Sequence, residues 1–170
     1  MQKKVMLTML SVVAATSLIA GCSNEETKTT VASVDSISKA STTYFYEEAS
    51  VTGDAFITFV KERTGAVSIA TTNEDGSPNL ATLVPTITDD GKYLIIVSAE
   101  NQTINNINER GMAVVEFFNY QPNEEDKMKR NTGARAIVKY DASAQKDLIS
   151  KYTPAEGATM LEIVKIIPLG

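Results

Sequence analysis

The stretch that decides the fold is GAVSIATTNEDGSPNLATLVPTITDDGKYLIIVSAENQT, residues 65–103. It contains three candidate strands separated by two Asp-Gly pairs, at 75–76 and 90–91. Glycine tolerates the positive φ that a tight turn requires, so an Asp-Gly pair between apolar runs favours a β-hairpin. The third strand ends in the polar segment 98–103, after which the pattern becomes helical. A helix that begins there would offer backbone N–H groups to an anion.

The alternation of apolar and polar residues predicts strands at 66–72, 79–88 and 93–98. The second strand contains Pro85, which cannot donate a hydrogen bond to a neighbouring strand. We therefore expect this strand to lie at an edge of the sheet or to bulge at the proline. The third strand contains the apolar run LIIV at 94–97, which is typical of a strand covered on both faces.

The rest of the folded region contains three candidate helices and three more candidate strands. The helices cover 54–63, 102–110 and a segment that Asp141 or Ser143 caps and that ends near Tyr152; the strands cover 112–119, 134–140 and 159–167. Short connections between successive strands favour antiparallel pairing, and closure into a barrel removes exposed strand edges. The predicted fold class is mainly β: a six-stranded antiparallel barrel with about three short flanking helices.

The N-terminal region has the layout of a secretory signal. Residues 1–4 include Lys3 and Lys4 and form a short basic start, and the apolar run 5–20 is short for a membrane span. The sequence IAGC at 19–22 resembles the bacterial lipobox, in which cleavage precedes a cysteine that carries diacylglycerol. This resemblance implies a signal peptide at 1–21 and a lipidated Cys22; an ordinary signal peptide with an incidental cysteine is the alternative.

A lipidated N-terminus implies an extracytoplasmic protein that is anchored to a bacterial membrane. Residues 22–50 are rich in Ser, Thr, Lys and Glu and predict a flexible tether, and 51–170 form the folded domain. Cleavage would remove Lys3 and Lys4, which reduces the 16 basic residues to 14 against 21 acidic residues, a net charge of −7. A surface this acidic argues against nucleic acid as a partner.

The sequence contains no histidine and one cysteine. The absence of histidine excludes a Ser-His-Asp triad, a His-ligated zinc site and an axial histidine for haem. A single cysteine excludes a disulfide within the chain. Any redox chemistry must therefore come from a bound cofactor or from carboxylate, amine, phenol or hydroxyl groups.

Three segments together resemble the FMN-binding split β-barrel family, which includes the pyridoxamine 5′-phosphate oxidases. They are GAVSIATTNEDGSPNLATLVP, DGKYLIIVSAENQTINNINERGMAVVEFFN and TGARAIVKYD, and the resemblance extends over residues 54–167. It implies a split β-barrel, a homodimer, and FMN in the groove between the two subunits.

The resemblance also implies which residues contact FMN. They lie on the second strand, at the end of the third strand and at the start of the following helix: Thr82, Leu83, Val84, Val97, Ser98, Asn101, Gln102 and Thr103. Hydroxyl groups and the amides of a helix N-terminus can donate to a phosphate. Many relatives have a Lys or Arg where this chain has Gln102, so Arg135 or a residue of the partner subunit would have to supply the missing charge.

The sequence is compatible with two functions. The first is a membrane-anchored, flavin-dependent oxidoreductase or electron carrier similar to pyridoxamine 5′-phosphate oxidase. The second is a non-catalytic split-barrel lipoprotein that has lost flavin and binds another small molecule or a partner in the cell envelope. The chain lacks the basic residues with which pyridoxamine 5′-phosphate oxidases hold their substrate, and its sequence identifies neither a substrate nor an electron donor or acceptor.

Overall fold

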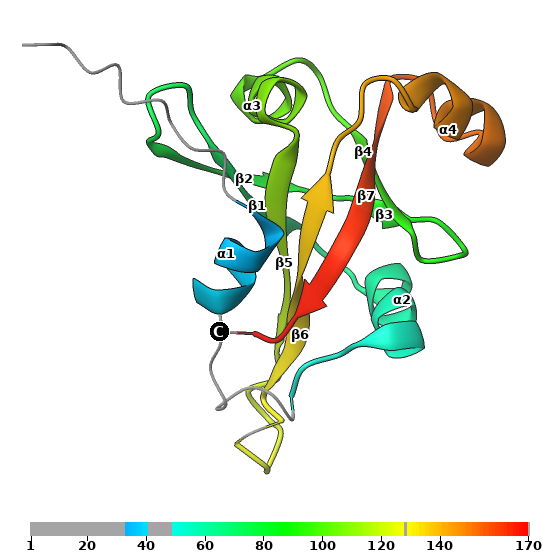
Figure 1. The fold of residues 1–170 in the computed structure, drawn as a ribbon. Helices are drawn as coiled ribbons and strands as arrows, with labels where there is room; N and C mark the ends of the chain where they lie inside the picture. The colour runs from blue at the N-terminus through cyan, green and yellow to red at the C-terminus, as the bar shows by residue number, and fades with distance from the viewer. Residues whose placement is uncertain (1–32, 41–48, 128, 170) are drawn as a thin grey trace, which may run out of the picture.

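A computed structural model describes residues 33–40, 49–127 and 129–169 (Figure 1). The expected signal peptide at 1–21 and the expected lipidation site at Cys22 lie outside these residues. Among the helices that the structure describes, none is long and apolar enough to cross a bilayer.

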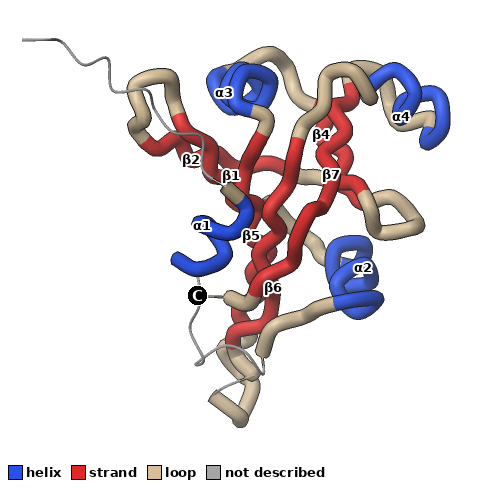
Figure 2. Tube along the Cα trace, in the orientation of Figure 1, coloured by secondary structure: helices blue, strands red, loops and turns tan. Residues whose placement is uncertain are grey.

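Within the described residues, seven strands form one antiparallel sheet in the order β2-β1-β5-β6-β7-β4-β3, and four helices flank it. The strands are β1 (Val67–Thr72), β2 (Pro78–Leu83), β3 (Thr86–Ile87), β4 (Tyr93–Val97), β5 (Met112–Tyr120), β6 (Asn131–Lys139) and β7 (Ala158–Ile167). The helices are α1 (Val34–Ala40), α2 (Gly53–Glu62), α3 (Gln102–Arg110) and α4 (Gln145–Tyr152). Figure 2 shows α3 and α4 at one end of the sheet and α2 toward the other end.

The sheet is curled because its two edge strands are neighbours in sequence. Strands β2 and β3 lie at opposite ends of the strand order, yet only Val84 and Pro85 separate them. Three extended residue steps span at most about 11 Å, so the two edges must approach each other there. No hydrogen-bonded pairing joins β2 to β3 in the described sheet. The expected mainly β, split-barrel fold with flanking helices is thus confirmed.

Three details differ from the expectation. The predicted strand 79–88 is two strands, β2 and β3, because the ladder breaks at Pro85, so the sheet has seven strands and not six. The additional helix α1 lies within 22–50, the range predicted to be a tether, and contacts β7. The other helices, α2, α3 and α4, occur where the sequence predicts them, but the expected cap of α4 is wrong. The N-cap of α4 is Ala144 and has no side-chain hydrogen bond, because Asp141 accepts from Ser143 within the turn that precedes the helix.

The core lies between the inner face of the sheet and α2. Phe56 of α2 meets Phe117 of β5 edge to face, with ring centroids 5.2 Å apart, and both side chains are fully buried. Arg63, just after α2, donates hydrogen bonds to the carbonyl oxygens of Gly65 and Pro85. This side chain therefore ties α2 to the segment where the barrel is split.

Candidate functional site

A cavity of about 220 Å³ lies at the split, between β2, the end of β4 and the N-terminus of α3. Six of the eight residues that the family resemblance singles out line it: Thr82, Leu83, Ser98, Asn101, Gln102 and Thr103. Ala81, Ile96 and Ile104 supply further, apolar parts of its wall. Strands β2 and β4 are not hydrogen-bonded neighbours, so the curl of the sheet is what brings these residues together.

Val84 and Val97, the other two residues of the expected set, do not line this cavity. Val84 lies in the link between β2 and β3 and is 69% exposed, and Val97 ends β4 and is 57% exposed. Leu80 of β2 is also 73% exposed. The two valines are thus exposed apolar side chains that adjoin lining residues in sequence, Val84 after Leu83 and Val97 before Ser98, and are not part of the cavity wall.

The first turn of α3 presents backbone donors to this cavity. The Asn101 side chain caps the helix by accepting a hydrogen bond from the Ile104 amide at 3.1 Å. The amides of Gln102 and Thr103 have no acceptor among the described residues. Because helix N-termini carry partial positive charge, these two N–H groups favour an anionic or strongly polar ligand atom.

The Ser98 hydroxyl, which was expected to contact the ligand, already takes part in hydrogen bonds within the protein. Its hydroxyl donates to the Ala99 carbonyl at 3.0 Å and accepts from the Asn101 side-chain amide at 2.9 Å. Since a hydroxyl has one proton to donate, Ser98 orients Asn101 in this structure. Its direct donation to a ligand would require the bond to Ala99 to break.

None of the residues that line the cavity carries a charge. Arg135, expected to compensate for the neutral Gln102, is not part of the lining; it donates to the Pro168 carbonyl at 2.9 Å from Nε and 2.7 Å from Nη2. On the far side of Gln102, a more open cavity is lined by Asn73, Glu74 and Asp75. Any anion held in the cavity at the α3 N-terminus is therefore bound by neutral donors.

A polar network centred on the buried Asn106, which is not predicted from the sequence, supports the cavity from behind. Asn106 of α3 is fully buried and donates to Thr71 at 3.0 Å and to Asn73 at 2.8 Å. Asn79 of β2 donates to Thr71 at 3.0 Å and to Thr103 at 2.9 Å. The available signal was that Thr103, Asn106 and Ile107 share one face of α3, where only apolar residues are expected.

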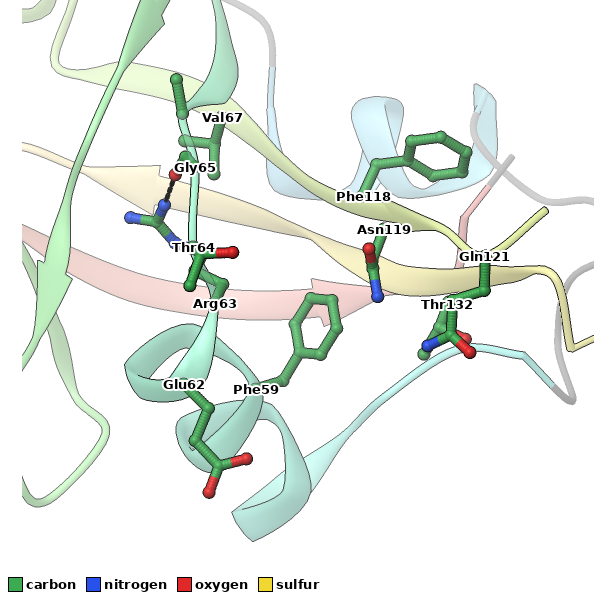
Figure 3. A pocket seen from close by; sticks show the side chains of 11 residues that line it. Phe59, Glu62, Arg63, Thr64, Gly65, Val67, Phe118, Asn119, Gln121 and Thr132 are labelled. Carbon is green, nitrogen blue, oxygen red and sulfur yellow. Dashed lines mark hydrogen bonds between the residues drawn. The ribbon is translucent and has the colours of Figure 1, made fainter. Parts of the chain in front are cut away.

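A second, larger cavity of about 410 Å³ lies between the end of α2, the start of β1 and the end of β5 (Figure 3). Phe59 and Phe118 contribute aromatic rings to its wall. The guanidinium of Arg63 points toward Gly65, and its Nε is buried without a partner. Burial lowers the pKa of Arg63 from its ordinary value. The Phe59 side chain is half-buried and packs against the hydrophobic core.

The two acidic residues of the β3–β4 turn contact the turn and the neighbouring helices α2 and α4. Asp90 accepts hydrogen bonds from the Thr88 hydroxyl at 2.7 Å and the Tyr152 hydroxyl at 2.7 Å, and Asp89 pairs with Lys61 at 2.6 Å. No group of three or more carboxylate, thiol or imidazole side chains that could hold a metal ion occurs in the part of the chain that the structure describes.

No protein-family model matches the chain, and no curated protein matches it either. Among solved structures, an FMN-binding protein from Syntrophomonas wolfei subsp. wolfei is 17% identical over 80% of this chain and 90% of its own, with a TM-score of 0.50. A putative pyridoxamine 5′-phosphate oxidase from Lactobacillus delbrueckii is 17% identical over 69% and 91% (TM-score 0.44). An FAD-binding protein from Mesorhizobium loti is 14% identical over 68% and 92% (TM-score 0.46). The similarity to the first protein agrees with the split β-barrel fold with flanking helices.

Proposed function

We propose that this chain binds a flavin, FMN, with the phosphate end at the N-terminus of α3. The observation that carries this proposal is the convergence of two unpaired α3 amides with the hydroxyls of Thr82 and Thr103 around one cavity. Helix N-terminal amides and hydroxyls are the donors that a phosphate monoester requires. The apolar side chains of Leu83, Ile96 and Ile104 form the rest of a wall on which a flat ring system could lie.

The size of the cavity supports a site that is shared between two copies. Its volume of about 220 Å³ is below the roughly 300–1,000 Å³ that is typical of small-molecule pockets. Beside it lie the exposed apolar side chains of Leu80, Val84 and Val97. A second copy of the chain that covers this surface would bury these side chains and complete the site, which makes a homodimer with flavin at the interface the arrangement we favour.

Bound flavin would supply hydride or electron transfer, and the protein would act as an oxidoreductase or an electron carrier. The residues of this chain would bind and orient the cofactor: the first turn of α3 holds its anionic end, and the apolar wall excludes water. No ionisable side chain lines the cavity, so acid–base chemistry would come from the substrate, the cofactor or the second subunit.

Absorbance spectroscopy of the purified full-length chain after incubation with FMN and removal of free ligand tests this proposal. We expect flavin absorbance that co-elutes with the protein at a molecular mass of two chains. A colourless protein that takes up no added FMN would contradict it.

One observation favours a second function. No cationic side chain lines the cavity, and the acidic residues Glu74 and Asp75 line the neighbouring one. These carboxylates would repel a phosphate but not a ligand without one, so the site suits a phosphate-free ligand. On this alternative, the barrel has lost flavin and binds another small molecule or a cell-envelope partner. A triple change of Thr82, Ser98 and Thr103 would then leave function intact, whereas changes of the surrounding surface would not.

We further propose that lipid on Cys22 anchors the protein to the outside of a bacterial membrane. The order of basic residues, apolar run and IAGC at 19–22 supports this proposal. A Cys22→Ala variant should move from the membrane fraction to the soluble fraction, and mass spectrometry of the wild type should find an acylated N-terminal cysteine. A wild-type chain with a free, unmodified Cys22 in the soluble fraction would contradict the anchor.

A further inference from the structure

The polar network behind α3 has a defined direction of hydrogen bonding. A carboxylate only accepts, so Ser77 must donate to Asp75, at 2.6 Å, and accept from the Asn73 amide at 3.0 Å. The hydrogen bond from the Ser77 hydroxyl, and one that the Ser77 backbone amide donates to Asp75 at 2.9 Å, hold the pKa of the Asp75 carboxyl below its ordinary value. The Asn73 oxygen is thereby left to accept from Asn106 at 2.8 Å, and the Asn106 oxygen accepts from Gln102 at 2.8 Å. Each amide in this series is therefore oriented by the carboxylate of Asp75.

Asn79 sets the direction of the Thr103 hydroxyl in the same way. A side-chain amide has two N–H donors, and those of Asn79 go to Thr71 and Thr103. Thr103 uses a lone pair to accept this bond, so its own proton must point elsewhere. Thr103 is only 6% exposed, and its hydroxyl donates to no described residue. The cavity that Thr103 lines is the open direction for this proton.

The network also sets where the first turn of α3 lies. Thr71 is on β1, Asn79 is on β2, and Gln102, Thr103 and Asn106 are on α3, so these hydrogen bonds connect the helix to both strands. Asn106 is fully buried, and each of its donors and its oxygen has a partner. A satisfied buried network of this kind rigidifies the elements that it joins.

We propose that Asn79 and Asn106 are positioning residues for the phosphate of the bound flavin. Asn79 turns the Thr103 hydroxyl so that it donates into the cavity, and Asn106 holds Gln102 and the first turn of α3 against β1. This inference rests on the proposed flavin site. Neither asparagine lines the cavity, so both act through other residues.

Riboflavin provides the test, because it has the ring system and ribityl chain of FMN but no phosphate. In the full-length chain, Asn79→Ala should weaken FMN binding about tenfold, since the Thr103 hydroxyl is no longer held in the direction in which it donates to the charged phosphate, and leave riboflavin binding within about twofold. Thr103→Val should have the same effect. In the Thr103→Val background, Asn79→Ala should add little, because the two residues act as one unit.

One further Asn79 variant and two control variants complete the test. Asn79→Asp has the shape of asparagine but would accept the Thr103 proton, and it should reduce the preference for FMN over riboflavin as well. Asn105→Ala and Asn105→Asp are the matched controls, since the Asn105 side chain has no hydrogen-bond partner among the described residues and the second variant adds the same charge on α3. Both controls should retain the wild-type preference.

The outcomes separate this inference from the proposed function. If the Asn79 variants lose FMN and riboflavin affinity equally, or lose only thermal stability, the positioning role is overturned and the flavin site stands. If the wild-type chain binds neither ligand, the proposed function fails and this inference fails with it.

Discussion

The cavity at the N-terminus of α3 and the cavity beside α2 differ in what their polar groups already contact. The α2 cavity is the larger, about 410 Å³ against about 220 Å³, but both terminal nitrogens of its one cation donate to backbone carbonyls, those of Gly65 and Pro85. The α3 cavity contains no charge, yet two amides and the Thr103 hydroxyl have donors without acceptors there. The α2 cavity also has one donor without a partner, the buried Nε of Arg63, whereas three such donors meet at the α3 cavity. Several unpaired donors around one cavity indicate a binding site better than volume does.

The largest expected effect is a loss of stability when the core packing of α2 is disrupted. Phe56→Ala removes a fully buried ring that meets Phe117 edge to face, and such truncations cost about 3–5 kcal/mol of unfolding free energy. Urea denaturation would measure this loss. Phe56→Leu should cost less, and a loss below about 1 kcal/mol for Phe56→Ala would show that α2 is not part of the core.

The next largest expected effect is a loss of stability in the polar network behind α3. Asn106→Ala removes a fully buried amide that is hydrogen-bonded to Thr71, Asn73 and Gln102, and unfolding free energy should fall by about 2–3 kcal/mol. Unlike Phe56→Ala, this variant should also weaken FMN binding while it remains folded. Thermal denaturation and FMN titration would be measured together, with Asn105→Ala as the control; unchanged stability would mean that the network is not formed.

Arg63→Ala tests whether this residue serves the fold and not a ligand. Two hydrogen bonds to backbone carbonyls and the contact with the Phe117 ring at 5.7 Å would be lost, at a cost of about 2 kcal/mol. FMN affinity should stay unchanged when measured below the melting temperature. A large loss of FMN affinity without loss of stability would indicate that FMN binds in the α2 cavity and not in the α3 cavity.

The smallest expected effect is a change in FMN affinity at the α3 cavity. Gln102→Lys adds a charge-assisted hydrogen bond to the phosphate, and FMN affinity should increase by about fivefold, with a stronger dependence on salt concentration. Gln102→Glu, the matched control of opposite charge, should weaken FMN binding, and neither variant should change riboflavin binding. Fluorescence titration at two salt concentrations would show this. Equal responses to FMN and riboflavin would mean that the phosphate is not near residue 102.

Local signals predicted the elements that form the site. Asn101 caps α3, and Gly111, with φ of 68°, ends it, so the helix has the limits that the sequence indicates. Pro85 interrupts the strand where its missing N–H requires. The resemblance to the FMN-binding split β-barrel family supplied six of the nine residues that line the cavity, together with Val84 and Val97, which are exposed and do not line it.

The supporting network was beyond sequence reasoning because it depends on long-range contacts. Asn106 and Thr71 are 35 positions apart, and Asn79 and Thr103 are 24 apart. Periodicity places each residue on a face of its own element but does not say which polar groups meet across two elements. The same limit applies to Arg135, whose hydrogen bonds to Pro168 become visible only when β6 and the end of the chain are placed side by side.

Hydrogen exchange of backbone amides, measured on the full-length chain with and without FMN, tests the central claim most directly. The claim is that the α3 cavity, and not the α2 cavity, holds the ligand. We expect slower exchange of the Gln102 and Thr103 amides when FMN is bound, and no change at residues 63–67. Protection at residues 63–67 with none at the start of α3 would contradict the account.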